Sequence, residues 1–153
     1  MAVAILLAGA VAWSVVGLAA VSLGTLAPEW LHSQLPPLVI DAPALGGGVT
    51  AMGVGLVVVG VTHGVVRAGL RRGYRWGLSA AVLLTGVMAV GLLALAAAGV
   101  SSAFALPASA LAMSAAGALA AVASAAYGWC TLSLVRRIGR GRDLARPEGP
   151  PVG

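Results

Sequence analysis

The sequence predicts an all-α integral membrane protein, a four-helix bundle made of two transmembrane hairpins. Three observations support this fold class: 60 % of the 153 residues are hydrophobic, only 8 % are charged, and the charges gather at a few places. A soluble domain carries about 25 % charged residues to cover its water-facing surface. A disordered chain combines high charge with low hydrophobicity. The composition excludes both classes and leaves a helical membrane protein.

Long uncharged segments predict the number of membrane crossings. Residues 1–28 and 42–66 carry no charge, and neither do the 60 residues from 76 to 135. One crossing takes roughly 20 apolar residues, so the first two segments suit one helix each and the third suits two. A transmembrane barrel would need alternating polarity, which these segments lack. We therefore expect a transmembrane domain over residues 1–135, with spans at about 3–26, 45–67, 77–100 and 110–135.

The first predicted span, residues 3–26, is interpreted as a retained helix rather than a signal peptide. No basic residue precedes it, and its apolar run exceeds the 7–15 residues of a signal-peptide core. Gly9, Gly17 and Gly24 share one face of this helix. An outer loop over residues 27–44 follows, and within it Glu29–Leu35 is expected to form one or two turns at the membrane interface, with Trp30 at headgroup level.

The remaining connections are placed where charges or prolines interrupt the apolar sequence. We expect an inner loop over residues 68–76 and an outer turn over residues 101–109. Residues 136–153 form a basic tail that ends in proline and glycine and is predicted to be mostly disordered.

The arginines predict the orientation. All nine lie either around the predicted inner loop or after the fourth span, and the two outer connections contain no basic residue. The positive-inside rule then places both termini in the cytoplasm, in a multi-pass protein of the bacterial cytoplasmic (inner) membrane. This placement accounts for the net charge of +5 without nucleic-acid binding. The residues assigned to orientation and to anionic headgroups are Arg67, Arg71, Arg72, Arg75, Arg136, Arg137, Arg140 and Arg142.

Small residues mark the faces on which these helices are expected to pack. In lipid, close backbone approach drives helix association, and small side chains permit it. The second span contains a Gly-x-x-x-Gly pair, and the fourth has two neighbouring stripes of small residues, the second being Gly117, Ala121 and Ala125. A GC-rich genome is an alternative source of the alanines. The predicted packing positions are Gly60, Gly64, Ala116, Ala120, Ser124 and Gly128.

The spans are poor in the groups that transport and catalysis need. They contain no Asp, Glu, Lys or Arg away from their ends, whereas ionisable residues inside a membrane usually mark transport pathways. The small multidrug transporters also have four helices but rely on a glutamate in the first, which this chain lacks. Single Cys130 excludes an internal disulfide. No nucleophile–base pair is apparent, so we expect a non-enzymatic protein.

Three residues are weak candidates for binding a haem or quinone: His63, Tyr127 and Trp129. A haem held by two histidines needs a second one on the same side, and His32 is predicted on the opposite side. The simpler interpretation of His63 is a hydrogen bond to a headgroup or a backbone carbonyl. No cofactor is therefore predicted.

Glu29, His32 and Asp41 are weak candidates for a metal site outside the membrane, since Glu-x-x-His spacing places two ligands on one helix face. A di-metal site needs more carboxylates than the outer loops offer, so no metal is predicted. The hydroxyls within the spans are expected to bond carbonyls of their own helices. They are Ser14, Thr50, Thr62, Ser79, Thr85, Ser114, Ser124, Thr131 and Ser133.

Taken together, these features favour an accessory or structural subunit that packs against a larger membrane complex, or against a second copy, through Gly/Ala helix faces. The alternative is a small transporter or a lipid- or quinone-binding protein with a cavity between its helices, in which Thr62, His63 and Tyr127 supply polar anchors. A third hypothesis, an enzyme acting on lipid, requires Glu29, His32 and Asp41 to converge.

Overall fold

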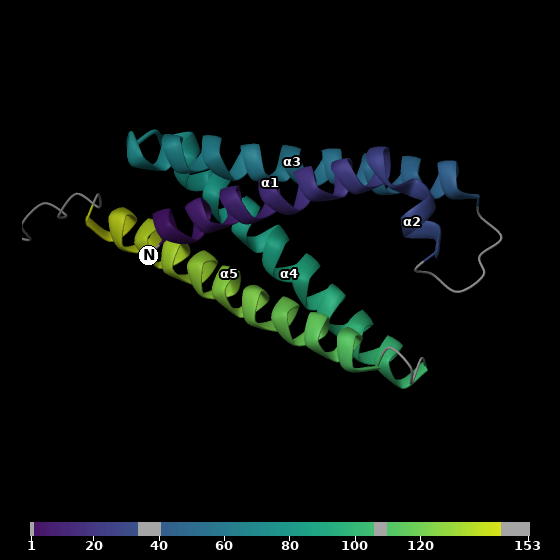
Figure 1. The fold of residues 1–153 in the computed structure, drawn as a ribbon. Helices are drawn as coiled ribbons and strands as arrows, with labels where there is room; N and C mark the ends of the chain where they lie inside the picture. The colour runs from purple at the N-terminus through teal and green to yellow at the C-terminus, as the bar shows by residue number, and fades with distance from the viewer. Residues whose placement is uncertain (1, 34–40, 106–109, 145–153) are drawn as a thin grey trace, which may run out of the picture. The chain divides into compact units, whose positions relative to one another are not determined.

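The computed structural model describes residues 2–33, 41–105 and 110–144, and it confirms the all-α prediction for them. Figure 1 shows the five helices of this part of the chain: α1 (Ala2–Leu26), α2 (Pro28–Ser33), α3 (Ala42–Arg71), α4 (Arg75–Ala105) and α5 (Ala110–Leu144). Helices account for 96 % of the described residues.

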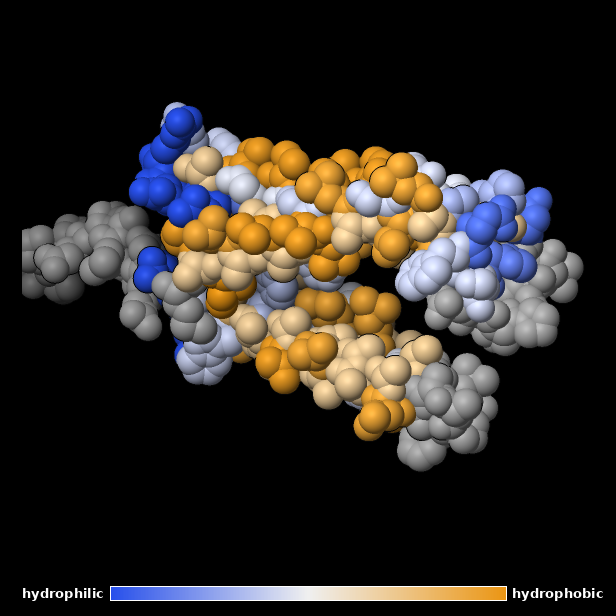
Figure 2. Space-filling model, viewed as in Figure 1, coloured by the Kyte–Doolittle hydropathy of each residue, from blue (hydrophilic) through white to orange (hydrophobic). Residues whose placement is uncertain are grey.

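Four of these helices, α1, α3, α4 and α5, are long and apolar enough to cross a membrane. Large apolar side chains cover their surfaces, among them Leu83, Val90 and Val122, each at least 70 % exposed. Figure 2 shows the same pattern, with hydrophobic residues along the helices and hydrophilic residues near their ends. Such a surface is unfavourable in water and favourable in hydrocarbon. By length and composition, these four candidate transmembrane helices indicate a multi-pass membrane protein.

The helices extend beyond the predicted spans because charge marks the edge of an apolar segment but does not end a helix. Between α3 and α4 only Arg72, Gly73 and Tyr74 lie outside helices, although residues 68–76 were expected to form a loop. Gly73 has a φ of +72°, the left-handed conformation that commonly follows a helix C-cap and that glycine adopts without steric cost. Gly73 therefore lies in a three-residue connection, Arg72 to Tyr74, between the end of α3 and the start of α4.

The C-terminal segment also differs from its prediction. Helix α5 continues to Leu144, so residues 136–144 are helical, where mostly disordered chain was expected. The four arginines of this segment are good helix formers, whereas Gly139 and Gly141 disfavour helix by about 1 kcal/mol each. Residues 145–153 of the predicted tail lie outside the described residues. So do positions 106–109 of the predicted outer turn, of which residues 101–105 belong to α4.

The predicted outer loop contains more helix than expected. The short helix expected there is present as α2, which only Ala27 separates from α1, and α3 begins at Ala42 rather than at 45. The end of the Glu29–Leu35 prediction falls on positions 34–40, which are not described.

The chain divides into two compact units. One is Leu6–Arg72, and the other is Gly73–Gly153 together with Met1–Ile5. We call the first unit, which contains α2, α3 and all of α1 after Ile5, the first hairpin, and α4 with α5 the second hairpin.

Candidate functional site

Glycines set the separation of α1 and α3 in the first hairpin. A β-carbon placed on Gly17 would lie 2.6 Å from the carbonyl oxygen of Gly53, and one on Gly53 would lie 2.7 Å from that of Gly17. Gly24 and Gly46 form a second reciprocal pair, with corresponding distances of 2.5 and 2.6 Å. Real β-carbons do not approach backbone atoms this closely, so only glycine permits this contact.

The same contact continues along α3 at seven-residue spacing. Gly46 and Gly53 are followed by Gly60, whose added β-carbon would lie 2.9 Å from the carbonyl oxygen of Ala10. The pairs run in opposite directions along the two helices, which makes the hairpin antiparallel. Gly46 also faces Pro28, so α2 packs on the start of α3. The glycine face of the first hairpin is therefore used within the hairpin itself.

Hydroxyl groups join α4 and α5 in the second hairpin. The Thr131 hydroxyl donates to Oγ1 of Thr85 at 2.8 Å, and Thr85, which is fully buried, donates to the carbonyl of Ala81 at 2.7 Å. The Ser124 hydroxyl donates across the hairpin to the carbonyl of Ala89 at 2.7 Å. Two of the other hydroxyls bond their own helix as expected: Thr62 donates to the Val58 carbonyl and Ser133 to the Cys130 carbonyl.

Small residues bring α4 and α5 close together farther along the hairpin. A β-carbon on Gly99 would lie 3.0 Å from the Gly117 Cα, and one on Gly117 would lie 3.2 Å from the carbonyl oxygen of Ala96. These contacts are less severe than those between α1 and α3. They place the two backbones against each other with few side chains between them.

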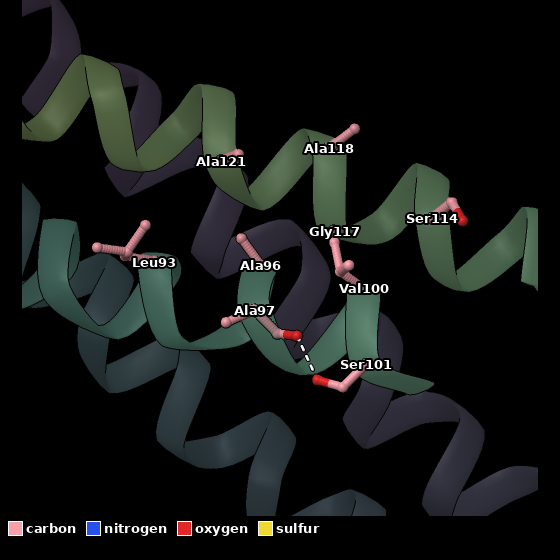
Figure 3. A pocket seen from close by; sticks show the side chains of 9 residues that line it. All are labelled: Leu93, Ala96, Ala97, Val100, Ser101, Ser114, Gly117, Ala118 and Ala121. Atoms are coloured by element: carbon pink, nitrogen blue, oxygen red, sulfur yellow. Dashed lines mark hydrogen bonds between the residues drawn. The ribbon is translucent and has the colours of Figure 1, made fainter. Parts of the chain in front are cut away.

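A groove of about 660 Å³ lies on one side of this close contact. Figure 3 shows its walls, which consist of short side chains from both helices. Among the described residues that line it, Ser101 and Ser114 carry hydroxyls, and Ser101 donates to the Ala97 carbonyl of its own helix at 2.5 Å. We call this the Ala118 groove. It is lined by Leu93, Ala96, Ala97, Val100, Ser101, Ser114, Gly117, Ala118 and Ala121.

A smaller groove of about 350 Å³ lies on the other side of Gly117, and we call it the Ala116 groove. Its α5 wall contains Met113, Ala116 and Ala120, and its α4 wall contains Leu95, Ala98 and Gly99. Both sides of the α4–α5 contact are therefore hollowed, because small side chains hold the backbones together but do not fill the space beside them.

The residues predicted to mark helix-packing faces lie in three different kinds of surroundings. Gly60 contacts α1, and Ser124 bonds α4. Ala116 and Ala120 line the Ala116 groove. A β-carbon on Gly64 or Gly128 would meet no atom within 4 Å.

The candidate cofactor ligands do not share a unit. His63 is fully buried in the first hairpin, and its Nδ1 lies 2.8 Å from the Val59 carbonyl oxygen, the carbonyl contact that was expected. In the second hairpin Tyr127 is buried, whereas Trp129 is 55 % exposed. Trp129 thus has the character of a lipid-facing side chain.

The candidate metal ligands include one residue with a clear structural role. Asp41 caps α3, because its Oδ1 accepts a hydrogen bond from the Ala44 N–H at 2.9 Å. Glu29 and His32 lie on α2. Within residues 2–33, 41–105 and 110–144, no group of three or more His, Cys, Asp or Glu side chains is placed to hold a metal ion.

The predicted orientation residues lie at helix ends. Arg67 and Arg71 are in the last turns of α3, Arg72 is its C-cap, and Arg75 begins α4. Arg136 and Arg137 are exposed on α5. Arg140 and Arg142 belong to the last part of the α5 backbone. Beside Arg75, the rings of Tyr74 and Trp76 stack with centroids 6.1 Å apart.

Sequence reasoning missed three sets of contacts. The seven-residue spacing of Gly46, Gly53 and Gly60 was available in the sequence and identifies the α3 face. An aspartate two residues before a proline was a signal for the α3 cap. No sequence signal pairs Thr85 with Thr131, because the pairing depends on the register of the hairpin.

Known proteins offer no guide to the role of these contacts. Comparison of the chain with protein-family models, with curated proteins and with solved structures finds no match.

Proposed function

We propose that the chain is a non-enzymatic accessory or structural subunit of a bacterial cytoplasmic membrane, with both termini in the cytoplasm. In this proposal its two hairpins associate as a four-helix bundle. It assembles with a larger membrane complex, or with a second copy, through small-residue helix faces.

The Ala118 groove is the observation that carries this proposal. The side chains of Ala97, Ala118 and Ala121 in its walls are short and apolar, and the side chains of the hairpin leave the groove unfilled. In lipid, helices associate where small residues let backbones approach, since apolar area alone gives no advantage over lipid tails. A helix from another subunit that enters this groove gains such contacts.

Glycines with open space beside them lie on both hairpins. An added β-carbon meets no atom within 4 Å on Gly91 and Gly128 in the second hairpin, nor on Gly55 and Gly64 in the first. Both hairpins therefore keep small positions that another helix can approach, and the Ala118 groove makes the second hairpin the proposed assembly surface.

Leucine substitutions at Ala118 and Ala121 test this proposal. They fill the groove, so we expect them to shift the protein from a larger species to its monomer on blue-native gels in mild detergent. The matched control is Ala126→Leu, since Ala126 is exposed on the opposite side of α5 from Gly117. A wild-type protein that migrates only as a monomer, or equal behaviour of all three variants, contradicts the proposal.

A second candidate function rests on the apolar lining of the same groove. A lipid tail or a quinone tail can lie along an open groove of about 660 Å³ that presents few polar atoms. In this case the groove holds a lipid or a quinone instead of a helix from another subunit, and the protein binds or transports such molecules. Mass spectrometry of the purified protein distinguishes them: a retained lipid or quinone that Ala118→Leu displaces, without any change in oligomeric state, favours this candidate.

A further inference from the structure

Three arginines surround one small hollow at the end of α3. Arg67, Arg71 and Arg72 line it together with Ala68, and its volume is about 350 Å³. Arg67 and Arg71 are one helical turn apart, so they lie on the same face of α3. Arg72 is the C-cap residue of that helix. Three cationic side chains of one hairpin therefore meet at one place.

Their charge is not balanced within the described part of the first hairpin. Its acidic residues are Glu29 on α2 and Asp41 at the start of α3. From Asp41 to Arg67 the helix rises by roughly 40 Å, well beyond the range of direct ion pairing. Like charges this close repel one another, and an anion that contacts all of them removes the repulsion.

Arg67 has a donor without an acceptor. Its Nε is buried and makes no hydrogen bond with any described residue. Buried donors are nearly always paired, so an unpaired one requires an explanation. Oxyanions accept the Nε–H and one Nη–H of a guanidinium together, in a side-on geometry. Arg67 itself lines the hollow, so an oxyanion held there lies beside this guanidinium.

We infer that Arg67, Arg71 and Arg72 form a binding site for a phosphate group. A phosphate monoester suits it best, because it carries about −1.5 to −2 charge at neutral pH and three acceptor oxygens. A phospholipid headgroup and a soluble phosphate ester share this chemistry. The inference rests on the proposed membrane placement of the α3–α4 turn, where Tyr74 and Trp76 suit headgroup level, but not on the Ala118 groove.

Native mass spectrometry of the full chain in detergent tests the site. The probes are phosphatidic acid (a monoester), phosphatidylglycerol (a diester), phosphatidylcholine (net neutral) and inorganic phosphate. We expect one phosphatidic acid per chain, bound more tightly than phosphatidylglycerol, and no comparable retention of phosphatidylcholine. If inorganic phosphate competes with phosphatidic acid, the site also accepts soluble phosphates. If inorganic phosphate does not compete, the site is specific for lipid headgroups. Equal retention of all three lipids overturns the inference.

Paired variants separate a defined site from a diffuse basic surface. Arg67→Gln with Arg71→Gln removes two charges from the hollow, and we expect phosphatidic acid to bind about tenfold more weakly, since charge-assisted hydrogen bonds are lost. Arg136→Gln with Arg137→Gln removes the same charge beyond the last span. This control is expected to weaken phosphatidic acid and phosphatidylglycerol by the same small factor, as loss of a diffuse attraction to headgroups does, and to leave the preference for phosphatidic acid unchanged. An equal loss in both double variants overturns the inference.

Lysine variants keep the test valid if the glutamine variants unfold. Arg67→Lys with Arg71→Lys retains the charge but loses the planar fork of donors. We expect this folded variant, checked by its thermal transition, to bind phosphatidic acid several-fold more weakly than the wild type. Unchanged affinity overturns the inference. Because none of these arginines lines the Ala118 groove, loss of phosphate binding and loss of assembly are separate results.

Discussion

Gly17 and Gly53 meet across the first hairpin so closely that a β-carbon on either would lie within 2.7 Å of the other's carbonyl oxygen. Alanine at either position forces α1 and α3 apart. We expect Gly17→Ala or Gly53→Ala to lower the free energy of unfolding by about 1–3 kcal/mol, the usual cost of overpacking. Denaturant titration of the protein in detergent micelles measures this change.

Gly55 provides the matched control for this prediction, because it lies on the same helix and an added β-carbon meets no atom within 4 Å. Gly55→Ala should leave stability unchanged or raise it by about 0.5–1 kcal/mol through helix propensity. If Gly53→Ala is as stable as Gly55→Ala, the close contact between α1 and α3 is not present.

Thr85 and Thr131 are expected to be energetically coupled through their hydrogen bond of 2.8 Å. A double-mutant cycle with Thr85→Val and Thr131→Val should give a coupling of about 0.6 kcal/mol and at most about 1.7 kcal/mol, the range measured for such bonds in membranes. Unfolding in detergent of the wild type, both single variants and the double variant supplies the four free energies.

Thr62 is the control for this cycle, since its hydroxyl bonds only the Val58 carbonyl of its own helix among the contacts described. Paired with Thr85→Val, Thr62→Val should give additive effects. Additivity in the Thr85–Thr131 pair as well contradicts the interhelical bond.

Asp41 is expected to act as a helix cap. Asp41→Ala removes the acceptor of the Ala44 N–H and should destabilise α3 by about 0.5–2 kcal/mol. Asp41→Asn keeps an acceptor and should restore most of that stability. The measurement is again unfolding in detergent.

Asp41→Asn also separates capping from metal binding. If the asparagine variant loses as much stability as the alanine variant, and added divalent metal stabilises only the wild type, Asp41 is a ligand rather than a cap.

The proposed orientation predicts which exposed positions react from outside the cell. In a Cys130→Ala background, which removes the single cysteine, Ser33→Cys on α2 should react with a membrane-impermeant thiol reagent in intact cells. Gly139→Cys on α5 should react only after permeabilisation, because the arginine-rich side faces the cytoplasm. The reverse pattern shows the opposite orientation, and equal reaction of both positions in intact cells contradicts two cytoplasmic termini.

The candidate site could be predicted only in part. The stripe of small residues on α5 was visible, yet its members lie in different surroundings: Ser124 bonds α4, Ala116 lines a groove and Gly128 faces open space. A helical repeat tells which residues share a face, but the partner helix and its register decide what that face meets. The same limit applied to the pair Gly60 and Gly64, of which only Gly60 contacts α1.

The sequence by itself determined the helical class, the four long apolar segments and the arginine-rich helix ends, because hydrophobicity and charge act position by position. It did not determine where the helices end, because backbone hydrogen bonding continues past the apolar segment, as at Leu144. Only the tertiary structure decided which small residues contact the other helix of their hairpin and which have open space beside them. That choice depends on how two helices are aligned: at the register observed, Gly17 meets Gly53 and Thr85 meets Thr131, while Ala118 and Ala121 are left beside an unfilled groove.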